Sequence, residues 1–188
     1  MNKPKVINLF GGPGCGKSTT AAGLFYQMKV AGIKVELVTE YAKELVYDNT
    51  LDIMLDRQEV IFAEQNQRLH RLRNKVEFAI VDSPILLSYI YPEMNQEQKN
   101  IAHWPALGAF KQLVVEVFHT YDNLNFFLNR QPDTFEEYGR DHNEHQAISL
   151  DDRIQQTLSD LSVPHETIDV GPDTVATILS WSALDKWT

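Results

Sequence analysis

The sequence predicts an α/β fold in which a parallel sheet is covered by helices on both faces. Short apolar segments rich in Val, Ile, Leu and Phe alternate with segments of helical periodicity, and most of the connections are short. This alternation is typical of right-handed β–α–β units. The chain has 188 residues, of which 43% are hydrophobic, and this is enough for one sizeable core. We therefore expect a single domain over residues 1–188.

Strands buried on both faces of a sheet are short, continuous apolar runs rather than alternating ones. The segments with this character are residues 5–10, 33–40, 77–84, 123–130 and 165–171. Helical spacing predicts helices over residues 17–31, 51–75, 106–121, from about 149 onward and near the C-terminus. Gly32 ends the first of these helices, and Gln58 and Gln65 interrupt the apolar face of the second.

The segment between the fourth strand and the helix that opens near Ser149 is polar and has no apolar periodicity. A loop of about 20 residues without structure is uncommon in a compact domain and is often functional. We expect residues 130–149 to form a mobile lid.

Composition limits the classes of function. The formal net charge is −9 and there is one cysteine, which argues against general affinity for nucleic acid and against a disulfide framework. We expect a cytoplasmic protein without a membrane partner, since no signal peptide and no long apolar run is present. One basic segment, residues 68–75, is either a solvated helix end or a local nucleic-acid contact.

The segment GGPGCGKS satisfies the pattern G-x-x-x-x-G-K-[ST] and lies between a predicted strand and a predicted helix. In such a loop, successive backbone N–H groups and the positive end of the helix bind phosphate. The residues expected to bind ATP are Gly11, Gly12, Pro13, Gly14, Cys15, Gly16, Lys17, Ser18 and Thr19. Lys17 is expected to reach the β- and γ-phosphates, and Ser18 is expected to ligate Mg²⁺.

Asp82 ends the third predicted strand and is the second expected Mg²⁺ ligand. Ser83 and Pro84 follow it, so the sequence has no acid at this point to polarise water for hydrolysis. The sequence also has no N/T-K-x-D signature for guanine. A hydroxyl group is therefore the expected acceptor of the phosphoryl group.

Phosphoryl transfer to a hydroxyl needs an acid that orients the acceptor and cations that stabilise the migrating charge. Glu40 ends the second predicted strand, where open α/β sheets bind ligands, and is the candidate acid. Arg130 and Arg140 bracket the predicted lid, and Arg153 is a weaker third candidate for the cations.

Gln58 and Gln65 allow two interpretations. Their carboxamides match the donor and acceptor pair of a pyrimidine edge, with Arg57 adding a phosphate contact. Alternatively, they are satisfied glutamines at the edge of the core.

The phosphate loop, the segment VELVTEYAKELVY, the strand IVDSP and the arginine-bracketed loop together resemble bacteriophage-encoded P-loop kinases similar to thymidylate kinases and to the ribosylnicotinamide kinase domain. The resemblance implies a P-loop NTPase fold of the kinase type, a three-layer sandwich with a five-stranded parallel sheet and a mobile lid. It also implies ATP and Mg²⁺ as cofactors. Within this family the pattern is most similar to the 5-hydroxymethyluracil DNA kinases, which implies a base hydroxymethyl group in DNA as acceptor.

Two other functions remain open at the level of sequence. One is a kinase of free nucleosides or nucleoside monophosphates. The other is a P-loop ATPase or nucleotide switch, for which an acid after Asp82 would be expected in place of Ser83.

Overall fold

The computed structural model describes residues 3–48, 58–99, 106–131 and 144–182. These residues form a five-stranded sheet in the order β2-β3-β1-β4-β5, and every neighbouring pair is parallel. The strands are β1 (Lys5–Phe10), β2 (Val35–Val38), β3 (Phe78–Val81), β4 (Asp122–Asn129) and β5 (Glu166–Asp169). The predicted five-stranded parallel sheet is confirmed.

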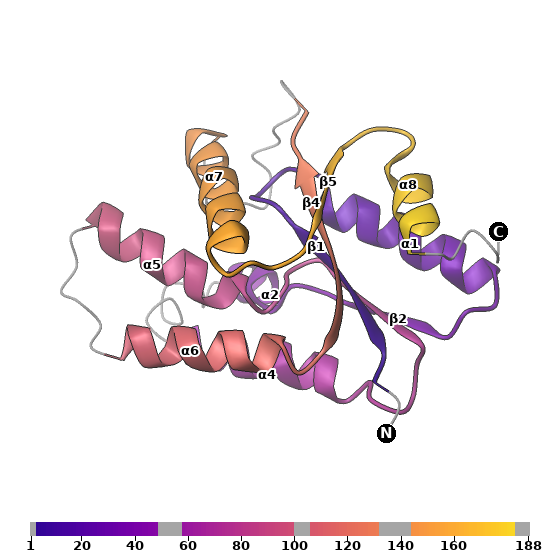
Figure 1. Ribbon diagram of the computed structural model, residues 1–188, viewed down its shortest axis with the longest axis horizontal. Helices are drawn as coiled ribbons and strands as arrows, with labels where there is room; N and C mark the ends of the chain where they lie inside the picture. The colour runs from indigo at the N-terminus through magenta and orange to yellow at the C-terminus, as the bar shows by residue number, and fades with distance from the viewer. Residues whose placement is uncertain (1–2, 49–57, 100–105, 132–143, 183–188) are drawn as a thin grey trace.

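Helices cover both faces of this sheet (Figure 1). They are α1 (Lys17–Val30), α2 (Tyr41–Tyr47), α4 (Gln58–His70), α5 (Leu87–Lys99), α6 (Leu107–Phe118), α7 (Glu144–Asp160) and α8 (Thr174–Trp181). Helices α1 and α8 pack on one face, while α4, α5, α6 and α7 pack on the other. In the described part of the chain, no helix combines the length and the apolar character needed to cross a bilayer.

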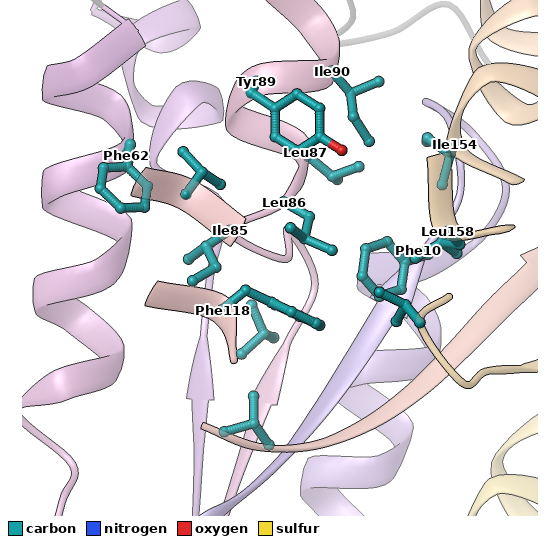
Figure 2. Packing of buried hydrophobic residues seen from close by; sticks show 14 of the residues in the cluster. Phe10, Phe62, Ile85, Leu86, Leu87, Tyr89, Ile90, Phe118, Ile154 and Leu158 are labelled. Carbon is teal, nitrogen blue, oxygen red and sulfur yellow. The ribbon is translucent and has the colours of Figure 1, made fainter. Parts of the chain in front are cut away.

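Strand β1 lies at the centre of the sheet and sends alternate side chains to the two cores, as the period of a strand requires. Val6 and Phe10 belong to the core beneath α4–α7, and Ile7 and Leu9 belong to the core beneath α1 and α8. The first core is rich in aromatic side chains (Figure 2). The rings of Phe10 and Phe118 pack edge to face, with their centroids 6.4 Å apart. Burial on both faces explains why the strands read as continuous apolar runs.

A buried polar contact interrupts this apolar centre and fixes the pairing of β1 with β4. Asn8 Nδ2 donates to Oδ1 of Asn123 and to Oδ1 of Asn125, both at 2.9 Å. Asn125 in turn donates to the carbonyl of Pro164 at 2.9 Å. Asn8 and Asn125 are register partners, so a shift of the strands by one residue would leave these buried amides unsatisfied.

Several elements differ from the sequence-based expectation. Helix α2 occupies the segment after Glu40, and α5 follows β3 although Pro92 lies inside it. Helix α4 ends at His70, and residues 71–75 turn, with Asn74 at a φ of 62°. Helix α7 begins at Glu144 rather than near Ser149, so residues 144–149 of the predicted lid are helical. Residues 132–143 of that lid lie outside the described residues.

Candidate functional site

The phosphate loop leaves β1 at its C-terminal end and leads directly into α1. Gly16 is the N-cap of α1 and has a φ of 93°, a left-handed conformation that glycine adopts without strain. No side chain caps this helix, so the N–H groups of its first turn face the loop without a side-chain acceptor. These groups and the positive helix end could hold phosphate.

Lys17 extends over this loop. Its Nζ donates to the carbonyl oxygens of Gly11 and Gly12, at 2.7 and 2.8 Å. The ammonium group is therefore held against the loop by two carbonyl oxygens, which phosphate oxygens could replace.

Ser18 and Asp82 meet across the sheet edge, 64 residues apart in the chain. Ser18 Oγ donates to Asp82 Oδ2 at 3.1 Å. Asp82 is buried, and burial raises the pKa of this carboxyl, against the lowering effects of the Ser18 hydrogen bond, the charges of Lys17 and Lys43 and a hydrogen bond from the backbone of Glu40. A buried carboxyl group beside a serine hydroxyl fits a Mg²⁺ ligand set, since Mg²⁺ takes oxygen ligands and commonly one or two from the protein.

Glu40 lies close enough to Lys17, Lys43 and Asp82 for their charges to act on it. It occupies the N-cap position of α2, but its side chain makes no capping hydrogen bond, which removes the helix-cap explanation for this acid. Part of the side chain meets solvent, while the carboxyl group is enclosed, and this burial raises its pKa. The charges of Lys17 and Lys43 lower that pKa and the charge of Asp82 raises it.

Gln65 does not present a free carboxamide to a ligand. Its Oε1 accepts from the N–H of Tyr41 at 3.1 Å. Its Nε2 donates to the carbonyls of Thr39 and Ser83, both at 3.3 Å. Between the two interpretations of this residue, the contacts favour the satisfied core-edge glutamine, because both of its donors are used by the protein.

The other predicted substrate contacts are less defined. Gln58 begins α4 and is buried, with 6% of its surface exposed. Arg57 and Arg140 lie outside the described residues. Arg153 pairs with Glu93 of α5 at 3.0 Å.

Arg130 contacts both the phosphate loop and α7. Its Nη2 donates to the carbonyl of Pro13 at 2.8 Å, and its Nε pairs with Asp151 Oδ2 at 2.9 Å. The other carboxylate oxygen of Asp151 accepts from the N–H of Gly12. A Cβ on Gly12 would lie 2.6 Å from the carbonyl of Ala147, so glycine is what allows α7 to approach the loop this closely.

Two residues near this site were not predicted from the sequence. Asp151 is one, and its only signal was a polar position on an amphipathic helix. Tyr91 of α5 is the other: burial raises the pKa of its hydroxyl well above its usual value, and the charges of Glu40 and Asp151 add to this effect. Both residues reach the site through tertiary packing, and no local sequence motif predicts their positions.

Two arginines of the basic segment 68–75 make contacts within the protein. Arg68 makes a bidentate pair with Glu44, at 2.6 and 2.7 Å, and contacts Glu64 at 3.1 Å. Arg73 stacks over the ring of Tyr121 at 5.0 Å and donates to Thr120. These contacts fit neither the solvated helix end nor the nucleic-acid contact completely. The side chains of Arg68 and Arg73 are bound within the protein, so they do not form a continuous row of cations for a nucleic-acid backbone.

Comparison with solved structures shows that this fold is similar to that of a deoxyadenosine kinase. Three structures of deoxyadenosine kinase from M. mycoides match 95% of this chain and 99% of their own. The structure with bound dATP has a TM-score of 0.66 at 17% identity, and the one with bound dCTP has 0.65 at 18%. The structure with the products dCMP and dCDP has 0.62 at 16%.

Comparison with curated proteins finds no match to this sequence. A family model described as an AAA domain matches residues 6–176. That range runs from Val6 in β1 into α8, so it includes all of the sheet except Lys5, together with Lys17, Ser18, Glu40 and Asp82. The chain belongs to this AAA domain family.

Proposed function

We propose that this protein is a kinase that transfers the γ-phosphoryl group of ATP to a hydroxyl group of a nucleoside or a nucleoside monophosphate. The observation that carries the proposal is the position of Glu40. An acid that does not cap its helix lies within electrostatic reach of Lys17 and of Asp82, where the phosphate loop would present the γ-phosphate.

Each residue has a role in this reaction. The amides of the loop and Lys17 would bind the β- and γ-phosphates, and Ser18 and Asp82 would hold Mg²⁺. When bound there, Mg²⁺ would supply positive charge that offsets the negative charge of the phosphate groups. Glu40 accepts the proton of the acceptor hydroxyl as its oxygen bonds to the γ-phosphorus, the bond to the β–γ bridging oxygen breaks, and ADP leaves.

A hydrolytic function is less well supported. Ser83 follows Asp82 where an ATPase would need an acid, and its carbonyl is bound by Gln65. The acceptor suggested by resemblance, 5-hydroxymethyluracil in DNA, needs a flipped or single-stranded base and cations along the backbone. Because Arg68 and Arg73 are engaged within the protein, a small acceptor is the better-supported choice.

The test is transfer of labelled γ-phosphate from ATP in the presence of Mg²⁺. The acceptors are deoxynucleosides, their monophosphates, DNA containing 5-hydroxymethyluracil and the same DNA with thymine. We expect label in one or more small acceptors. Label in the hydroxymethylated DNA alone would replace the small acceptor by the DNA base, and ATP hydrolysis without label in any acceptor would contradict the kinase.

The site itself is tested by Lys17→Ala. Loss of a positioned cation from the transferring phosphoryl group is expected to lower turnover by about 10²–10³-fold. Lys29→Ala is the matched control, because Lys29 lies at the far end of the same helix and pairs with Glu36 on the surface. Circular dichroism should show both variants folded, and near-normal turnover of Lys17→Ala would refute the assignment.

A further inference from the structure

We propose that Gln65 is a positioning residue that holds Glu40 in place relative to Asp82. The effect on turnover rests on the proposed function, whereas the hydrogen bonds that carry the proposal do not. Gln65 touches the backbone on both sides of Glu40 and the residue after Asp82.

The structural need for such a residue arises where two neighbouring strands separate. Strands β2 and β3 are paired as far as Val38 and Val81, and the N–H of Asp82 still approaches the carbonyl of Val38 at 3.5 Å. Beyond this point the chain enters α2 on one side and the turn toward α5 on the other. The sheet itself therefore no longer sets the spacing of the two segments that carry Glu40 and Asp82.

The backbone of Glu40 forms one hydrogen bond to Asp82 across this gap, and the carboxamide of Gln65 adds a further connection between the two segments. Helix α4 places this side chain between the two segments, with only 3% of its surface exposed. One N–H bond goes to Thr39 on the first segment and one to Ser83 on the second. A single planar group thus spans the gap, and buried polar groups of this kind are costly to leave unpaired.

The third hydrogen bond restrains Glu40 from its other side. Tyr41 is the first residue of α2, so its N–H has no acceptor within the helix. Gln65 Oε1 supplies one at 3.1 Å. With Thr39 and Tyr41 both bound to the same side chain, the backbone of Glu40 between them has little freedom to move.

Restraint of this backbone matters because a general base must lie within hydrogen-bond reach of the hydroxyl from which it takes the proton. A displacement of the acceptor-side acid by about 1 Å can cost on the order of 10²-fold in rate. Gln65 therefore acts on catalysis through Glu40 and not by touching the acceptor.

The kinetic test compares Gln65→Met with Gln67→Met. Methionine keeps the length and approximate volume of glutamine but makes none of its hydrogen bonds. Gln67 lies two residues away on the exposed side of α4, so the same substitution there controls for the change of helix composition. We expect kcat of Gln65→Met to fall by about 10- to 100-fold while the KM for ATP stays nearly unchanged, and Gln67→Met to behave like the wild-type protein.

A second measurement does not depend on catalysis. Amide hydrogen exchange followed by NMR should show faster exchange at Tyr41 in Gln65→Met, because its N–H loses its acceptor. The same amide in Gln67→Met should keep the wild-type rate. A merely structural loss of helix stability would instead accelerate exchange along the whole of α4.

The outcomes separate this proposal from the proposed function. Unchanged kcat in Gln65→Met, or unchanged exchange at Tyr41, overturns the positioning role. If the wild-type protein phosphorylates no acceptor, the proposed function is wrong, and exchange at Tyr41 alone decides whether Gln65 holds this segment. Should Gln65→Met fail to fold, Gln65→Glu replaces it: an acceptor for Tyr41 remains, one or both donors are lost, and lowered kcat with protected Tyr41 is expected.

Discussion

The proposed reaction requires Glu40, but the ionised form of this buried carboxyl group lowers the stability of the folded protein. Burial raises its pKa, so the protonated carboxyl favours the folded state. This contribution is complete below the ordinary glutamic acid pKa of about 4.3 and is lost as the pH rises through the raised pKa. Above that range the ionised group destabilises the folded protein relative to an uncharged one.

We therefore predict that Glu40→Gln unfolds at a higher temperature than the wild-type protein near pH 8, and that the difference disappears near pH 4, below the ordinary pKa of about 4.3. Transfer should fall by about 10²–10⁴-fold, the usual contribution of a general base. Thermal melts at several pH values and the transfer assay measure the two effects. Glu59→Gln, on the exposed side of α4, is the control, and a Glu40→Gln protein that is less stable near pH 8 would contradict the prediction.

At the scale of residues, the predictable part of the site is the part encoded by local patterns. Lys17 and Ser18 belong to one motif, and Asp82 ends an apolar strand. The carboxyl ends of parallel strands share one edge of the sheet, so the meeting of Ser18 and Asp82 followed from the fold class. Asp151 touches the loop from 139 residues away, and no pattern within its own helix indicates this.

The same limit explains the two interpretations of Gln65. Its position in the helical stripe predicted that it faces inward, and it does. Whether its carboxamide meets a ligand or the backbone depends on where two other segments end, and these ends were not predictable to a residue. Helix α2 begins at Tyr41, and that boundary supplies the N–H which Gln65 binds.

At the scale of elements, α7 is coupled to the phosphate loop through one ion pair. Asp151 binds both Arg130 and the N–H of Gly12, and the side chains of the pair are 15% and 9% exposed. Removal of one partner from such an enclosed pair leaves the other charge uncompensated, at a cost of about 3 kcal/mol. The shape of the loop at Gly12 and Pro13 then depends on how α7 is seated.

We predict that Asp151→Asn lowers the unfolding free energy by about 3 kcal/mol and weakens the binding of a non-hydrolysable ATP analogue. Urea unfolding and calorimetric titration give the two quantities. Asp152→Asn, an exposed change one residue along α7, should alter neither. Weaker binding with unchanged stability would contradict the ion pair as the cause.

Two helices, α5 and α2, could not be predicted from the sequence. Helix α5 contains Pro92, which removes one backbone donor and normally ends a helix, so the segment after Asp82 gives no clear helical signal. Helix α2 has seven residues, too few for periodicity to separate it from the strand before it. The long alternating elements, from β1 through α1 and from α6 through β4, were predictable because their apolar runs and turn residues agree.

At the scale of the whole molecule, the distribution of charge bears on whether the acceptor is DNA or a small molecule. The net charge is −9, and the exposed cations of the basic segment, Arg71 and Lys75, precede β3. Because the strands are parallel, this is the edge opposite the phosphate loop. A strand of six residues such as β1 spans about 20 Å, so a DNA backbone bound to these cations would lie roughly that far from the reaction centre.

We predict that reversing both charges, in Arg71→Glu/Lys75→Glu, leaves the KM for the acceptor unchanged, whereas Lys43→Glu raises it. Lys43 is exposed but acts on both Glu40 and Asp82, so its reversal adds repulsion where an anionic acceptor or ATP approaches. Initial rates in salt from about 50 to 200 mM complete the test, because DNA binding through many phosphates loses about 10³-fold or more in affinity over this range and a small acceptor does not. A raised KM in the double variant together with a steep salt dependence would show that the acceptor is held along the opposite edge, and the small-molecule acceptor would then be wrong.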